Sequence, residues 1–437
     1  MITNAEFNAR RQQLFASMPE NSVAIIAANK EVTRSNDTEF PFCQEKNFQY
    51  LTGFPEPDAI VVLIKTNENK QVLFCREKDA LQEVWHGRRI GPEVAADKFG
   101  FDESFALSEL ESKLPEYFAN KVELWHCHDE DTQAEKFVRE ALSKVKASVR
   151  QGISSPSIRV DCREQIHEMR LFKSDAEINI MREANLISGR AHQRAMKFCQ
   201  PSKNEYHIEA ELHHEFAMSG AKHPAYGSIV AGGDNANILH YTENSDELKD
   251  GDVLLIDAGC ELQGYAADIT RTFPINGKFT TEQAALYQLV LDAMNATIEA
   301  TKPGTTLAKL NDLCHQVLTK GLIDLGILIG DYEELLTEKA CKQYFIHGLG
   351  HWLGLDVHDV GDYQVVEKRQ TRVFEPGMVL TIEPGLYIPS DDMSVDEKWR
   401  GLAIRIEDNI VITEQGNENL TTNSPKEIAE IEALMAS

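Results

Sequence analysis

The stretch that decides the fold reads GDVLLIDAG and spans residues 251–259. It is a short apolar run of the kind that forms a buried strand, and it ends in one acid, Asp257, and a glycine turn. A second stretch, GMVLTIEPG at residues 377–385, repeats this plan and ends in Glu383. We therefore predict an internal duplication, in which equivalent strands deliver Asp257 and Glu383 to equivalent places.

Helical patterns precede each of these strands. Capping boxes, in which Ser or Thr is followed three residues later by Glu or Gln, begin helices predicted over residues 174–199 and 280–303. A second helix follows each of them, over residues 204–219 and from Leu307 to at least Val317. The two halves thus share one order of elements.

The chain of 437 residues is too long for one ordinary core, so we expect two domains. Residues 150–157 have linker composition, and a new helical pattern begins at Ser174. We place the boundary near residues 165–173, between an N-terminal α/β domain (1–170) and an α+β catalytic domain (171–437). Buried strands are predicted in the first domain over residues 22–28, 59–65, 71–75 and 121–125.

Composition restricts the functional classes. The net charge of −26 disfavours nucleic-acid binding, because the overall field repels polyanions. We see no apolar run long enough to span a membrane and no signal peptide. The eight cysteines form no CxxC pair, which indicates reduced thiols and a cytoplasmic protein.

Four acids lie in or beside apolar strands: Asp257, Asp268, Glu383 and Glu407. A buried carboxylate is costly unless it is paired or binds a metal. Any one of them alone fits a strand-end acid bonded to a cap or an arginine equally well. Four of them, together with the histidine-rich loop HGLGHWLG at residues 347–354, favour a metal site.

The loop itself does not form a known helical metal motif. Its glycines argue against a helix, and it lacks the Glu of a zincin HExxH. Four carboxylates and one imidazole would be neutralised by two divalent cations, and such oxygen-rich ligation suits Mn²⁺. Arg405 shares a strand face with Glu407 and could orient a ligand carboxylate.

A second histidine cluster lies elsewhere, in the WHCH stretch of residues 125–128. His126 and His128 would share a strand face and could both bind a metal. The sequence offers no distant partner for them, so we interpret this stretch as structural.

Several motifs together resemble the aminopeptidase P family, the Xaa-Pro aminopeptidases, which are pita-bread metallopeptidases related to prolidase and methionine aminopeptidase. The resemblance spans the chain. It rests on the segments IDAGC (256–260), DITRTF (268–273), HGLGHWLG (347–354), EPG (383–385), RIED (405–408), YLTGF (50–54) and WHGRR (85–89).

The resemblance implies a ligand set for two divalent cations and a bridging hydroxide between them. Asp257 would bind one cation and His351 the other, while Asp268 and Glu407 would bridge both. Glu383 would bind the cation at His351 and act as the acid and base.

The resemblance also implies supporting residues. His240 would lie near the substrate, His358 would stabilise the tetrahedral intermediate, and His347, Tyr387 and Arg405 would assist. The N-domain residues Asp37, Trp85 and Arg150 would help to build the site of a neighbouring subunit in a dimer or tetramer. The arginine expected near Arg369 and Arg372 is displaced, so neither is assigned.

The implied reaction removes an N-terminal residue that precedes proline, so the partners are peptides with proline at position two. A prolidase acting on Xaa-Pro dipeptides is the close alternative. A methionine aminopeptidase would not need the large N-terminal domain. A non-catalytic pita-bread protein that binds partner proteins should lack the ligands, and every ligand is present here.

Overall fold

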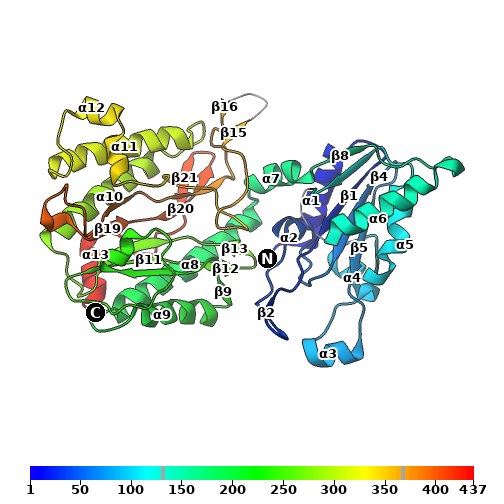
Figure 1. The fold of residues 1–437 in the computed structure, drawn as a ribbon, viewed down its shortest axis with the longest axis horizontal. Helices are drawn as coiled ribbons and strands as arrows, with labels where there is room; N and C mark the ends of the chain where they lie inside the picture. The colour runs from blue at the N-terminus through cyan, green and yellow to red at the C-terminus, as the bar shows by residue number, and fades with distance from the viewer. Residues whose placement is uncertain (129–132, 366–369) are drawn as a thin grey trace. The chain divides into compact units, whose positions relative to one another are not determined.

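The computed structural model describes residues 1–128, 133–365 and 370–437 (Figure 1). It divides into two compact units, Met1–Arg170 and Leu171–Ser437. Among the described residues, no helix combines the length and apolar character that crossing a membrane requires.

The first unit is built around a six-stranded sheet in the order β6-β5-β4-β1-β7-β8. Buried aliphatic residues face helices α5 (Leu110–Phe118) and α6 (Gln133–Ala147) on one side of it. Helices α1 (Asn4–Ser17) and α2 (Lys46–Thr52) also belong to this unit. The strands are β6 (Glu103–Ala106), β5 (Lys70–Cys75), β4 (Ile60–Lys65), β1 (Ser22–Ala27), β7 (Glu123–His126) and β8 (Ile158–Val160). The four predicted strands correspond to β1, β4, β5 and β7, with ends that differ by one or two residues.

Both edges of this sheet are parallel pairs. Strand β5 pairs in parallel with β6 at one edge. At the other edge β7 pairs in parallel with both β1 and β8, and Trp125 lies opposite Val160. The segment 150–157, which has linker composition, precedes β8 inside the first unit. Helix α7 (Cys162–Leu171) follows β8 and ends where the second unit begins.

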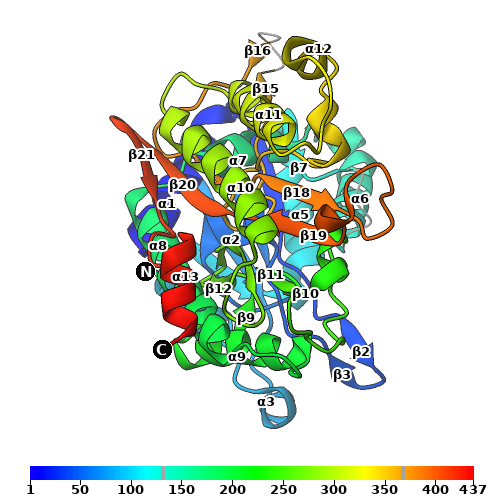
Figure 2. The ribbon, with the colours of Figure 1, turned by 90° about the vertical axis from the view of Figure 1, so that its left-hand side faces the viewer.

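The second unit has the same order of elements in its two halves. The first half has α8 (Asp175–Phe198), α9 (Glu205–Met218) and the sheet β10-β11-β14. The second has α10 (Thr281–Ala300), α11 (Leu307–Asp324) and the sheet β17-β20-β21. Within each half the two helices pack against each other (Figure 2). The strands are β10 (Ile229–Gly232), β11 (Val253–Asp257), β14 (Thr270–Pro274), β17 (Val379–Ile382), β20 (Asp408–Thr413) and β21 (Gly416–Asn419).

Sequence explains where these helices begin. The side chains of Ser174 and Thr280 each accept a hydrogen bond from the backbone N–H three residues further on. In turn, the side chains of Glu177 and Gln283 accept from the backbone N–H groups of Ser174 and Thr280. Behind the sheets, one continuous core joins apolar residues of all four helices to strands of both halves.

The two halves meet at the start of β14. Thr270 forms an isolated bridge with Glu407, and the guanidinium of Arg271 pairs with Asp408 at 2.8 Å. Both side chains of this ion pair are fully buried, so the halves are joined by a specific polar contact as well as by apolar packing.

One prediction about strands was wrong in detail. The sequence predicts one strand through residues 404–412 that carries Arg405 and Glu407, but there are two: β19 (Leu402–Arg405) pairs with β18 (Gly385–Ile388), and β20 begins only at Asp408. Glu407 lies in the break between them. Because Arg405 and Glu407 do not belong to one strand, the period-two argument that placed them on one face does not apply.

Candidate metal centre

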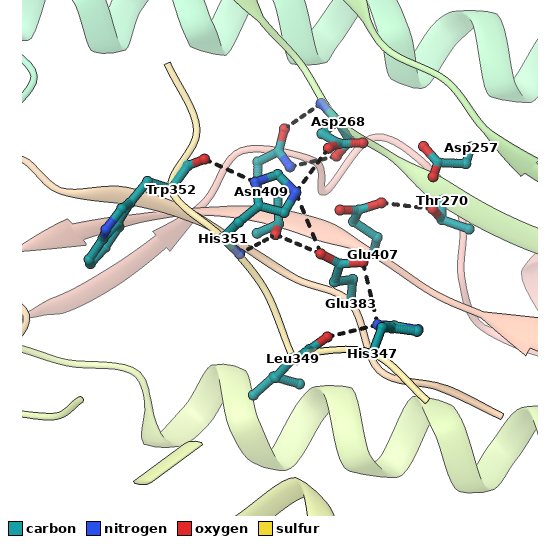
Figure 3. A network of polar contacts seen from close by, with 12 residues as sticks. Asp257, Asp268, Thr270, His347, Leu349, His351, Trp352, Glu383, Glu407 and Asn409 are labelled. Atoms are coloured by element: carbon teal, nitrogen blue, oxygen red, sulfur yellow. Dashed lines mark hydrogen bonds and ion pairs between the residues drawn. The ribbon is translucent and has the colours of Figure 1, made fainter. Parts of the chain in front are cut away.

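Acids from both halves converge with the histidine loop at one place (Figure 3). Asp268, His351 and Glu407 each offer a ligand atom, and these atoms all lie within 4.8 Å of one another. His351 Nε2 lies 3.4 Å from Asp268 Oδ2 and 3.5 Å from Glu383 Oε1. Asp257 joins the group through Tyr226, whose hydroxyl contacts both Asp257 and Asp268.

Strand ends deliver these acids. Asp257 is the last residue of β11, and Glu383 directly follows β17. Ile382 lies opposite Asp408 in the antiparallel pair β17–β20, so the next residues in register are Glu383 and Glu407. Asp268 precedes β14, and its backbone is held on both sides by the side-chain amide of Asn409.

The imidazole of His351 is oriented by its own loop. Its Nδ1 donates a hydrogen bond to the carbonyl of Trp352 at 2.9 Å, so Nε2 is the nitrogen that faces the acids. Its backbone N–H donates to the Thr381 hydroxyl at 3.0 Å, and that hydroxyl donates to Glu383 Oε1 at 3.2 Å. One threonine of β17 therefore fixes both a histidine and an acid of the centre.

Arg405 supports the side of the centre that carries Asp257. Its guanidinium donates to Asp257 Oδ2 at 2.7 Å, to the Tyr387 hydroxyl at 2.9 Å and to the Thr270 hydroxyl at 3.2 Å. The Thr270 hydroxyl in turn donates to Glu407 Oε2 at 2.7 Å. Arg405 is buried, and Asp257 is the acid of the centre to which its guanidinium donates.

These carboxylates are buried close together, so their negative charges repel one another and shift their pKa values. Burial and the charge of Asp257 raise the pKa of Asp268, and burial and the charge of Asp268 raise the pKa of Glu407. Burial also acts to raise the pKa of Asp257, but the Arg405 guanidinium outweighs it and holds that pKa below its usual value. Burial acts to lower the pKa of His351, but the hydrogen bond and charge of Asp268 raise it to about 9.

These shifts test whether cations fit the site. In the protein alone, protons on His351 and on the acids must offset the crowded negative charge. Two divalent cations would do so without protons, because four carboxylates and a neutral imidazole carry about four negative charges. The donors are oxygen atoms and one imidazole nitrogen, a set that suits Mn²⁺ and related ions. The residues present therefore fit a pair of divalent cations.

The centre opens into a cavity of about 550 Å³. The expected histidines line it: His240 and His358 are exposed at its wall, and His347 is half-buried. The ring of His358 lies edge-on to that of His351, with centroids 4.3 Å apart. Imidazoles thus surround the acids on the side that a ligand would approach.

His347 is held neutral by its surroundings. The Tyr387 hydroxyl accepts from Arg405 and donates to His347 Nε2 at 2.7 Å, while His347 Nδ1 donates to the Gly348 carbonyl at 2.7 Å. Burial lowers the pKa of His347 to about 4, and the positive charge of Arg405 contributes. His347 Nδ1 lies 3.9 Å from Glu383 Oε2, so it stands beside the acid without sharing a short hydrogen bond.

Three expected residues lie in the first unit. Asp37 is in the turn between β2 (Thr33–Ser35) and β3 (Thr38–Glu39), Trp85 is in α3 (Ala80–His86), and Arg150 is in a short 3₁₀ turn. All three are exposed, Trp85 to 75%. Arg369 lies outside the described residues, and Arg372 donates to the carbonyl of Asp362.

Sequence reasoning missed several residues that shape the centre. Tyr226 bonds two of the acids, Thr381 bonds His351 and Glu383, and Asn409 clamps the backbone of Asp268. Thr381 and Asn409 lie next to ligand positions in strands, which is a usable signal. Tyr226 lies in the irregular segment between β9 (His223–Pro224) and β10, and nothing in its local sequence indicates a site.

Comparison with protein families gives two matches. Residues 179–414 match the model described as metallopeptidase family M24. Residues 7–125 match the model described as the aminopeptidase P N-terminal domain. The two matches fall on different units of the structure.

Individual proteins resemble the whole chain. The Xaa-Pro aminopeptidase of Escherichia coli is 48% identical, and the match covers 99% of this chain and 98% of that protein. The Xaa-Pro aminopeptidase of Haemophilus influenzae is 45% identical, with coverage of 99% and 98%. Human Xaa-Pro aminopeptidase 3 is 34% identical, with coverage of 99% and 86%.

Solved structures match as closely. Zinc-substituted aminopeptidase P of E. coli in complex with product superposes with a TM-score of 0.97, at 48% identity, and covers 100% of this chain and 98% of that one. Proline aminopeptidase P II of Yersinia pestis also gives 0.97, at 48% identity and full coverage of both chains. These matches confirm the expected fold, an α/β N-terminal domain followed by a pita-bread domain with an internal repeat.

Proposed function

The chain belongs to metallopeptidase family M24, among its Xaa-Pro aminopeptidases, and on that premise we propose a role for each residue of the site. It hydrolyses the peptide bond between an N-terminal residue and a following proline, and its substrates are peptides with proline at position two. The observation that supports the assignment of residues is the convergence of four acids and His351 at the base of one cavity.

We assign the cations to two overlapping sets of ligands. Asp257 would be a ligand of one cation, His351 and Glu383 would be ligands of the other, and Asp268 and Glu407 would be shared between them. When bound, the cations would supply Lewis acidity, which polarises a carbonyl and makes a water molecule a better nucleophile. Manganese is the proposed metal, because the donors are almost all oxygen.

Glu383 is the proposed acid and base. It takes the proton of the attacking water and passes it to the leaving nitrogen. The proline nitrogen leaves as a secondary amine, so it must gain this proton as the C–N bond breaks. The hydrogen bond from Thr381 and the neighbouring His351 hold the carboxyl group of Glu383 in one orientation.

The histidines on the cavity wall handle the substrate. His358 donates to the oxygen of the tetrahedral intermediate, which carries negative charge only while that intermediate exists. His240, which also lines the cavity, contacts the substrate. The chain from Arg405 through Tyr387 to His347 Nε2 places the proton of neutral His347 on Nδ1, which donates to the Gly348 carbonyl beside Glu383.

The N-terminal domain, residues 1–170, is proposed to serve substrate access and oligomer contacts. Asp37, Trp85 and Arg150 are exposed in the structure, which leaves them available to a neighbouring subunit of a dimer or tetramer. A cytoplasmic location is proposed because all eight cysteines are free thiols, which persist in a reducing compartment.

One experiment tests the proposed centre and its specificity together. Metal is removed with a chelator, Mn²⁺, Zn²⁺ or Mg²⁺ is added back singly, and cleavage of Xaa-Pro-Xaa, Xaa-Ala-Xaa and Xaa-Pro peptides is measured. We expect activity to return fully only with Mn²⁺ and to favour Xaa-Pro-Xaa. Equal activity on Xaa-Ala-Xaa would contradict proline specificity, and activity confined to dipeptides would favour a prolidase.

A further inference from the structure

Two thiols meet at the β7–β8 edge of the N-terminal sheet. Cys127 follows β7 and Cys162 follows β8, and their Sγ atoms are 3.7 Å apart. The register explains the contact: Trp125 lies opposite Val160, and each cysteine lies two residues further along its strand. The two cysteines therefore lie side by side just past the carboxyl ends of adjacent parallel strands. Open α/β sheets usually bind ligands at this end of their strands.

A carboxylate completes a three-membered cluster. One ligand atom each from Cys127, Asp161 and Cys162 lies within 4.8 Å of the others. Asp161 is held in place, because its Oδ1 accepts from the backbone of Arg163 and from the Arg163 guanidinium, both at 2.9 Å. Arg163 also donates to the carbonyl of His128, which ties the chain after β7 to the chain after β8.

The spacing of the sulfur atoms suits a tetrahedral cation. Two metal–sulfur bonds of about 2.3 Å at the tetrahedral angle place the sulfurs about 3.8 Å apart. The Cys127–Cys162 separation of 3.7 Å agrees with this without movement of the backbone. Two thiolates and one carboxylate carry about three negative charges, of which a divalent cation neutralises two. The guanidinium of Arg163, which pairs with Asp161, offsets the third.

The cluster is reachable from solvent. Cys162 is buried, but Cys127 is half-buried and lines a cavity of about 230 Å³ together with Arg163, Asn47 and Glu45. A cation can therefore enter from the side of Cys127, and three protein ligands leave a fourth position for water or an external donor.

We propose that the N-terminal domain binds one thiophilic divalent cation of the zinc class at Cys127, Asp161 and Cys162. Binding forms two metal–sulfur bonds and releases one proton from each thiol, so no oxidant or reductant takes part. The site is chemically distinct from the catalytic centre, whose donors are oxygen and nitrogen only. It uses Cys127 of the WHCH stretch and not His126 or His128, the two residues that the sequence offered as ligands.

Cobalt distinguishes the two sites in the full-length protein. Co²⁺ bound to thiolates gives an intense near-ultraviolet charge-transfer band, and Co²⁺ bound to carboxylates and imidazole does not. We expect Co²⁺-loaded protein to show this band. We expect Cys127→Ser and Cys162→Ser each to lose the band and one metal equivalent by elemental analysis, with Xaa-Pro cleavage unchanged. Cys43→Ser, which changes an exposed thiol, should keep both the band and the metal.

A catalytic-centre variant completes the design. Asp268→Asn should lose peptidase activity and retain the band, which separates failure of this proposal from failure of the proposed function. Thermal unfolding of each cysteine variant checks that the fold is kept. No band in the Co²⁺-loaded parent, or a band that persists in Cys127→Ser, would overturn the proposal. Formation of a Cys127–Cys162 disulfide in place of metal uptake would overturn it as well, in favour of a redox pair.

Discussion

The guanidinium of Arg405 lies 2.7 Å from Oδ2 of Asp257, although the two residues belong to opposite halves of the pita-bread domain. The same guanidinium holds the Tyr387 hydroxyl and the Thr270 hydroxyl. Arg405 therefore couples one cation ligand to the residues that position His347 and Glu407.

Replacing Arg405 by lysine should damage this arrangement despite the conserved charge. A lysine ammonium cannot reach three acceptors with the planar geometry of a guanidinium. We expect Arg405→Lys to lower metal affinity or kcat by about 10- to 100-fold, the usual cost of losing a group that orients a ligand. Arg400→Lys, which changes an arginine whose guanidinium donates to the Val395 carbonyl, is the matched control and should have little effect.

Tyr226→Phe should weaken metal binding more than it weakens the fold. The Tyr226 hydroxyl donates to Asp257 at 2.6 Å and also contacts Asp268, so its loss frees two ligands to move. We expect metal affinity to fall about tenfold or more, measured by competition with a chelating dye. Tyr206→Phe, at an exposed position, is the control, and equal affinities in the two variants would contradict the positioning role.

Cation binding should stabilise the catalytic domain. A ligand that binds only the folded state at 100 times its Kd adds about 2.7 kcal/mol to the free energy of unfolding. Mn²⁺ should therefore raise Tm in the parent and leave that of Asp268→Asn nearly unchanged. In chelator alone Asp268→Asn should be the more stable, because it removes one of the crowded carboxylates. Asp312→Asn, at an exposed acid, should behave as the parent in both conditions.

Removing only one member of the buried ion pair Lys173–Asp359 should lower the free energy of unfolding substantially. Nζ of Lys173 lies 2.9 Å from Asp359 Oδ2, and each side chain is 1% exposed. Lys173→Met removes the ammonium that lies against this buried carboxylate and should cost clearly more in urea unfolding than the loss of an exposed ion pair. Arg182→Met, which breaks the half-exposed pair with Glu418, should cost about 1 kcal/mol or less. The double variant Lys173→Met with Asp359→Leu should recover part of the loss.

Buried His192 should make the catalytic domain less stable in mild acid. Burial lowers its pKa from 6.5 to about 4, and its Nε2 donates to the Ala258 carbonyl at 2.9 Å. The unfolded chain binds this proton more readily, so stability is full above pH 6.5 and falls as pH drops toward 4. The fall amounts to about 3 kcal/mol. In chelator, His192→Gln should show a flatter stability profile over this range, and a profile parallel to that of the parent would exclude His192 as the cause.

Much of the fold follows from local sequence. Ser174 and Thr280 start the long helices through caps that depend on neighbouring residues alone, and apolar runs ending in Asp257 and Glu383 fix two ligand-bearing strands. The break at Glu407 is not evident from the sequence, because residues 404–407 alternate apolar and polar as a strand does and an apolar run resumes at Ile410. It depends on the bridge to Thr270, which belongs to the other half.

The supporting residues of the site show the same limit. Tyr226 lies in an irregular segment, and only tertiary structure brings its hydroxyl to two acids. Cys127 and Cys162 belong to no shared sequence motif, and the parallel register of β7 and β8 brings them together. Contacts that depend on long-range register therefore remain beyond single-sequence reasoning.

The proposed ligands are divided between the two repeats. Asp257 and Asp268 come from the first repeat, and His351, Glu383 and Glu407 come from the second. A chain that stops before Glu407 would lack at least one proposed ligand, and neither repeat alone carries the full set. Completion of the centre would therefore have to wait until both repeats are synthesised and folded together.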